Sequence, residues 1–73
     1  MQGRSNTETK VMVALYCYSP RHGCSVYWTG CGWHPMGFEA ALFADEHYAE
    51  KATKGIALPE GAPEFRYEHR NMI

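Results

Sequence analysis

The fold of this chain is limited above all by a β-hairpin signal near its start. Residues 10–18 (KVMVALYCY) are apolar and aromatic, and a second such segment, residues 24–30 (CSVYWTG), follows Pro20 and Gly23. Proline fixes its own φ and lacks a backbone donor, whereas glycine tolerates positive φ, so together they favour a tight connection. The sequence therefore predicts an antiparallel hairpin.

The register of this hairpin follows from its hydrophobic pattern. A four-residue loop, residues 20–23, places Cys17 opposite Val26 and Tyr16 opposite Tyr27, whereas a five-residue loop mixes the two faces. The shorter loop also sets Leu15 against Trp28 and Ala14 against Thr29. The expected core face then consists of Val13, Leu15, Cys17, Cys24, Val26 and Trp28, and the opposite face carries Met12, Tyr16, Tyr18 and Tyr27.

A helix is expected in the middle of the chain. Residues 30–37 (GCGWHPMG) form an irregular link, and apolar residues at helical spacing predict a helix over residues 38–53, with Gly55 just beyond its end. Asp45 lies in the apolar stripe and would need a polar partner if buried. The residues expected to face the sheet are Phe38, Ala41, Leu42, Tyr48, Ala49 and Ala52.

The last expected element is a strand over residues 64–70 (EFRYEHR), whose apolar and charged residues alternate. The crossover through the helix leaves room for the first strand between the other two. We therefore expect an α+β fold, β-β-α-β, with a three-stranded antiparallel sheet in the order 2-1-3 and one helix on one face. Residues 10–73 would form this single domain, after a flexible N-terminal tail of residues 1–9.

The chain length, the cysteine count and the longest apolar run bear on the stability and the cellular location of this protein. A chain of 73 residues buries only about 60% of its unfolded surface, so a metal or a partner chain often adds stability. Three cysteines, an odd number, suit a reducing cytoplasm, and the apolar run of residues 11–18 is shorter than the roughly 20 residues a membrane helix needs. We expect a cytoplasmic protein without a membrane partner.

Nucleic acid is disfavoured as a direct partner. The net charge is −1, and the 7 lysines and arginines are scattered along the chain instead of forming a basic stripe. Residues 38–68 carry an excess of acidic side chains, which a solvated helix face would explain.

Cysteines and histidines suggest a possible metal site, and zinc is the metal that fits them. Zinc prefers four thiolate or imidazole ligands, and Cys31-x-x-His34 offers one closely spaced pair. Cys17 and Cys24 would complete the set on the expected core face, with His22 as a substitute ligand. The competing interpretation is that the cysteines are buried apolar residues. A zinc-stabilised domain with a structural or regulatory role is the second functional hypothesis.

A thiol-based enzyme is the third hypothesis, since His34 could lower the pKa of the Cys31 thiol. Nothing in the sequence orients this pair, and one helix on a small sheet leaves little room for a substrate pocket. We therefore expect a non-enzymatic protein and assign no catalytic residue.

Surplus aromatic residues support the leading hypothesis, a protein-binding module that occupies a partner's surface as an inhibitor or adaptor. Tyrosine, tryptophan and methionine are enriched at protein interfaces. A second copy of the chain is a candidate partner. The size and profile are also common among small accessory proteins of phages and mobile elements. The alternative is that the tyrosines stand in water, selected by β-propensity. The expected partner-binding residues are Tyr16, Tyr18, Tyr27, Trp33, Phe43 and His47.

Overall fold

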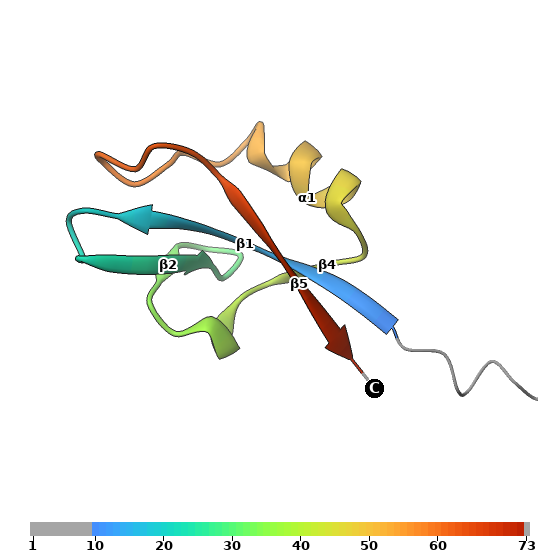
Figure 1. Cartoon of the computed structure of the whole chain (residues 1–73). Coiled ribbons are helices and arrows are strands. Elements are labelled where there is room, and N and C mark those ends of the chain that lie inside the picture. The colour runs from blue at the N-terminus through green and yellow to red at the C-terminus, as the bar shows by residue number, and fades with distance from the viewer. Residues whose placement is uncertain (1–9, 73) are drawn as a thin grey trace, which may run out of the picture.

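A computed structural model describes residues 10–72, so the expected tail of residues 1–9 lies outside the described part of the chain. Figure 1 shows a curled antiparallel sheet with one α-helix lying along one side, which agrees with the expected α+β class. In chain order the elements are β1 (Lys10–Ser19), β2 (Cys24–Trp28), β3 (Trp33–His34), the 3₁₀ helix η2 (Gly37–Glu39), β4 (Leu42–Phe43), α1 (Glu46–Thr53) and β5 (Arg66–Met72).

β1 is the central strand of the sheet. Tyr16 pairs with both Tyr27 of β2 and Arg66 of β5, and Val13 pairs with residues of both β4 and β5. A strand has only two hydrogen-bonding edges. β2 and β4 therefore follow one another along one edge of β1, while β5 occupies the other.

The hairpin register is confirmed over its first four pairs. Cys17 lies opposite Val26 and Tyr16 lies opposite Tyr27, as the four-residue loop requires. Gly23 has a φ of 72°, and its N–H donates to the carbonyl of Ser19 at 2.8 Å. Glycine takes this left-handed conformation at little cost, which lets the chain reverse so tightly.

The expected strand order differs from the structure in detail. β1 does lie between β2 and the last strand, but β3 and β4 extend the sheet, and β4 places Leu42 opposite Ala14 where Thr29 was expected. Each of these strands has 2 residues, too few to produce an alternating pattern. The last strand spans Arg66–Met72 instead of residues 64–70.

The expected helix start was wrong. α1 has 8 residues and begins at Glu46, because Asp45 is its N-cap: its carboxylate accepts a hydrogen bond from the Tyr48 N–H at 3.0 Å. Asp45 thus has its polar partner outside the core, at the helix end where such a side chain stabilises most. Among residues 10–72, no helix is long and apolar enough to cross a membrane.

The segment before α1 is not α-helical, which changes the exposure of its side chains. Residues 37–39 form only the single turn η2, and residues 42–43 pair with β1 as β4. Of the side chains expected to face the sheet, Ala49 is fully buried. Phe38 and Tyr48 are instead 79% and 57% exposed.

The core centres on β1, where Val13, Leu15 and Cys17 are buried on one face and Ala14 on the other. Cys24, expected in the core, is exposed at the end of the hairpin, and Trp28 is half-buried. The fully buried polar side chain is Ser19. The buried apolar residues are Val13, Ala14, Leu15, Cys17, Val26 and Ala49.

α1 covers the side of β1 on which Leu15 lies. Tyr67 of β5 pairs with Leu15 and therefore shares its face. Burial raises the pKa of Tyr67, and the carboxylates of Glu50 and Glu46 on α1 raise it further. The side chains of Tyr16 and its even-numbered neighbours in β1 consequently lie on the side of the sheet opposite α1.

Replacement of Asp45 by alanine should destabilise the fold by about 1 kcal/mol, because the first turn of α1 loses its capping acceptor. Thermal unfolding followed by circular dichroism should show a midpoint lower by roughly 4–8 °C for a domain of this size. The Asp45→Asn variant, whose side-chain oxygen still accepts the Tyr48 N–H, is the control and should remain near wild type. Equal midpoints for the two variants would contradict the capping role.

Candidate functional site

Three tyrosines share the side of the sheet that faces away from α1. Tyr16 and Tyr27 are direct cross-strand partners, and Tyr18 follows two residues later on β1 with Ser25 opposite. Tyr18 is 48% exposed, while Tyr16 and Tyr27 are half-buried. Strand alternation alone therefore produces this row of aromatic side chains.

Tyr16 and Tyr27 are held in place by their neighbours. Their ring centroids lie 5.6 Å apart at an interplanar angle of 30°, and the guanidinium carbon of Arg70 lies 5.3 Å from the Tyr27 centroid. The Arg70 Nε also donates to the Glu68 carboxylate at 2.8 Å. A cation over an aromatic face is attracted by the ring quadrupole, so this arrangement orders Tyr27.

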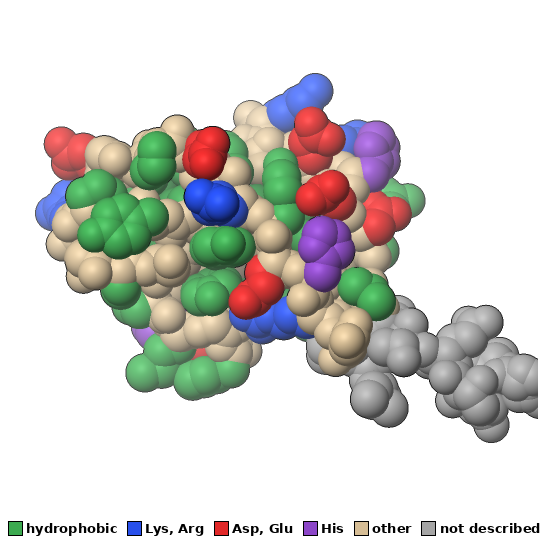
Figure 2. All heavy atoms as spheres, viewed as in Figure 1, with side chains coloured by type: hydrophobic (Ala, Val, Ile, Leu, Met, Phe, Trp, Pro, Cys, Tyr) green, Lys and Arg blue, Asp and Glu red, His purple; other side chains and the backbone are tan. Residues whose placement is uncertain are grey.

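The turn η2 extends the aromatic row. Gly37 lies so close to Tyr27 that a Cβ there would be 3.3 Å from two of its ring atoms. On either side of Gly37, Met36 and Phe38 are 50% and 79% exposed. Figure 2 shows hydrophobic side chains at the lower edge of the molecule, where Figure 1 places this turn. We name the surface formed by Tyr16, Tyr18 and Tyr27, together with Met36 and Phe38 on the turn beside Tyr27, the tyrosine face.

Trp33, one of the expected partner-binding residues, lies on the other side of the sheet. It pairs with Trp28, whose ring centroid is 5.5 Å away, and stacks on Phe65 at 6.1 Å. Its indole N–H donates to the carbonyl of Ala57 at 2.9 Å. Trp33 therefore packs the loop before β5 onto the sheet and is not part of the tyrosine face.

Phe43 and His47 also lie away from the tyrosine face. Phe43 belongs to β4, where it pairs with Val13 and is half-buried. His47 is exposed on α1, with its ring 6.0 Å from that of Tyr48. The helix expected over residues 38–53 would place Phe43 and His47 one turn apart, but the observed helix begins only after Phe43. Figure 2 shows acidic and histidine side chains gathered near α1.

The four expected metal ligands are not brought together. Cys17 is buried on the α1 side of β1, Cys24 and Cys31 are exposed, and His34 pairs with Tyr27 on the opposite side of the sheet. The His34 Nδ1 accepts the Met36 N–H at 3.3 Å. Among residues 10–72, no group of three or more His, Cys, Asp and Glu side chains could hold a metal ion.

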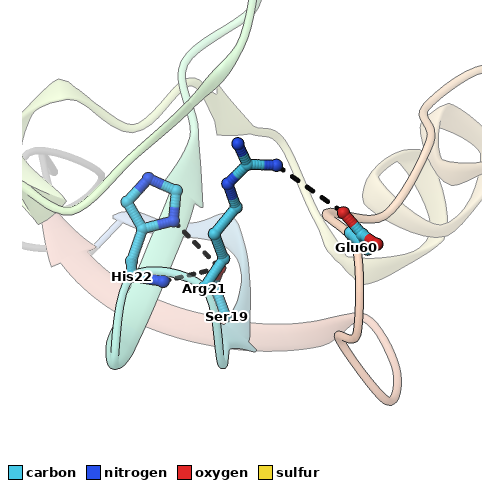
Figure 3. A network of polar contacts seen from close by, with 4 residues as sticks. All are labelled: Ser19, Arg21, His22 and Glu60. Carbon is cyan, nitrogen blue, oxygen red and sulfur yellow. Dashed lines mark hydrogen bonds and ion pairs between the residues drawn. The ribbon is translucent and has the colours of Figure 1, made fainter.

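A serine and a histidine, which sequence reasoning did not combine, meet in the hairpin loop (Figure 3). The Ser19 Oγ lies 2.9 Å from the His22 Nδ1, and the exposed Arg21 reaches Glu60 at 3.6 Å. Ser19 is fully buried, so its hydroxyl cannot meet a substrate. The contact closes the loop, and the ion pair connects that loop to the chain before β5.

The described residues contain no pocket, and comparisons with protein-family models, curated proteins and solved structures give no match. Sequence reasoning identified the tyrosines but missed Met36 and Phe38, which it assigned to a link and a helix. The signal available was Pro35 and Gly37, since residues of this kind favour turns over a helix start at Phe38.

The three thiols should differ in reactivity. Burial raises the pKa of the Cys17 thiol and shields its sulfur, whereas Cys24 and Cys31 are exposed. Since the thiolate is the reactive form, a chromogenic thiol reagent should modify two cysteines rapidly and Cys17 only on unfolding. Absorbance against time, in buffer and in denaturant, provides the measurement. The Cys17→Ala variant should keep both rapid reactions. Three equal rates in the native protein would contradict the buried position of Cys17.

Proposed function

We propose that this chain is a non-enzymatic protein-binding module, an inhibitor or adaptor that acts by covering part of a partner protein with its tyrosine face. The exposure of Phe38, 79% on a turn that is fixed against Tyr27, is the observation that carries the proposal. Burying a phenylalanine side chain against a partner's surface would contribute roughly 1.5–3 kcal/mol to the free energy of binding.

The composition of the tyrosine face supports a protein partner. Aromatic residues, methionine and arginine are enriched at protein interfaces, and tyrosine and tryptophan dominate their hot spots. Tyr18 and Phe38 would be the anchors, because they are the most exposed aromatic residues there. Tyr16 and Tyr27 are already held in place, since their tilted rings lie 5.6 Å apart and Arg70 lies over Tyr27.

The fixed positions of the Tyr16 and Tyr27 rings matter for affinity. Association costs conformational entropy for every side chain that becomes fixed, so rings already held in place lose less. The Arg70–Glu68 pair is half-buried, with side-chain exposures of 25% and 40%, and holds the guanidinium near Tyr27. The face is thus largely preorganised except at Met36 and Phe38, whose side chains project from the turn.

Removal of the two anchors should weaken partner binding without unfolding the chain. Immobilised wild-type protein and the Tyr18→Ser, Phe38→Ser variant would be exposed to a lysate of the encoding organism, and retained proteins quantified by mass spectrometry. The affinity of each retained protein would then be measured in purified form. We expect the double variant to bind at least tenfold more weakly, as loss of hot-spot residues requires.

The matched control is Tyr48→Ser, which removes an aromatic side chain of comparable exposure, 57%, from α1 on the other side of the sheet. This variant should retain the same proteins with unchanged affinity. Thermal unfolding would verify that all variants fold. If the anchor variant and the control bind every retained protein equally well, the tyrosine face is not the binding site.

A further inference from the structure

β5 has one hydrogen-bonding edge that the described chain leaves open. All 7 residues of this strand pair with β1 on one side, and no second strand among residues 10–72 pairs with the other. No turn or loop backbone hydrogen bond within the same range reaches β5. Such an edge presents a row of free N–H and C=O groups to another strand.

The usual obstacles to edge pairing are missing from β5. The strand contains no proline, lysine or glycine, and its pairing with β1 runs without a bulge from Arg66 to Met72. Its protection comes only from charge, through Arg66, Glu68 and Arg70. Charges exclude strands whose own charges do not match, but they admit one with the complementary pattern.

The strand is complementary to itself. In a symmetric antiparallel pair, the only register that uses all 7 residues is centred on His69. It places Glu68 opposite Arg70 of the second copy, and Arg70 opposite Glu68. A register centred on Glu68 instead sets glutamate against glutamate. Opposite charges in cross-strand positions stabilise a sheet, and like charges destabilise it.

We propose that a second copy of this chain pairs with the open edge of β5, antiparallel and centred on His69, to form a continuous sheet through the two molecules. Within one chain, Glu68 and Arg70 already form an ion pair of 2.8 Å beside Tyr27. Pairing brings two such ion pairs together in an alternating cluster of four charges. The inference does not depend on the proposed function of the tyrosine face.

Charge exchange tests the register. Sedimentation equilibrium should show a wild-type dimer, and either Glu68→Arg or Arg70→Glu alone should raise its Kd about tenfold, because two attractive cross-strand pairs become repulsive. The variant carrying both changes restores opposite charges and should recover most of the affinity. Thermal unfolding of each variant would measure the separate loss of the Arg70 contact with Tyr27.

Glu64→Arg is the matched control. Residue 64 precedes β5 and has no partner in the register centred on His69, so the Kd should not change. In a register centred on Tyr67, the same residue would lie opposite Arg70. A monomeric wild type, a dimer that Glu68→Arg does not weaken, or a dimer that Glu64→Arg weakens would overturn the proposal.

A disulfide trap provides an independent measurement. Directly opposite residues have Cα atoms about 4.5–5.5 Å apart, within disulfide range. In a Cys24→Ser, Cys31→Ser background, His69→Cys should therefore form a covalent dimer under oxidised glutathione. Asn71→Cys should not, since its two copies would lie about 14 Å apart. Equal rates of covalent dimer formation for the two variants would overturn the register.

Discussion

The pairing of β1 on both of its edges is the constraint on which the rest of the structure depends. One edge holds β2 and β4 in succession, and the other holds β5. Its odd-numbered residues Val13, Leu15 and Cys17 are buried on the side of the sheet where α1 lies, whereas its even-numbered tyrosines face the other way. A shift of one residue in any ladder would exchange the core with the surface, so register alone separates the parts that stabilise the fold from those available to a partner.

The parts of the fold that the sequence predicts are those set by local chemistry. The hairpin register follows from Pro20, Gly23 and the alternation around them, and the structure agrees over the four pairs nearest the loop. The sequence pattern did not predict the start of α1. Apolar residues from Phe38 to Leu42 imitate helical spacing, but Asp45 caps the helix later in the chain. β3 and β4 are too short to show an alternating pattern in the sequence. They form only because they pair with the longer strands β2 and β1.

The candidate site was predictable to the extent that it depends on strand alternation. Tyr16, Tyr18 and Tyr27 share a face because the hairpin register requires it. Phe38 was missed because its segment was expected to belong to the helix, whereas in the structure this segment is a single turn and the Phe38 side chain is exposed. The four expected metal ligands failed to meet because spacing along the chain does not determine which side of the sheet a residue occupies.

The tyrosine face and the open edge of β5 are geometrically compatible. Directly opposite residues of an antiparallel pair lie on the same face, so two copies joined along β5 would present both tyrosine faces on one side of the joint sheet. With strands about 4.8 Å apart, the two β1 strands would be separated by roughly 14 Å. A partner with two matching surfaces could then bind both faces at once, and the second contact would form at high effective concentration. Few side chains among residues 10–72 are fully buried, so the backbone pairing of a shared sheet would add stability beyond that of this small core.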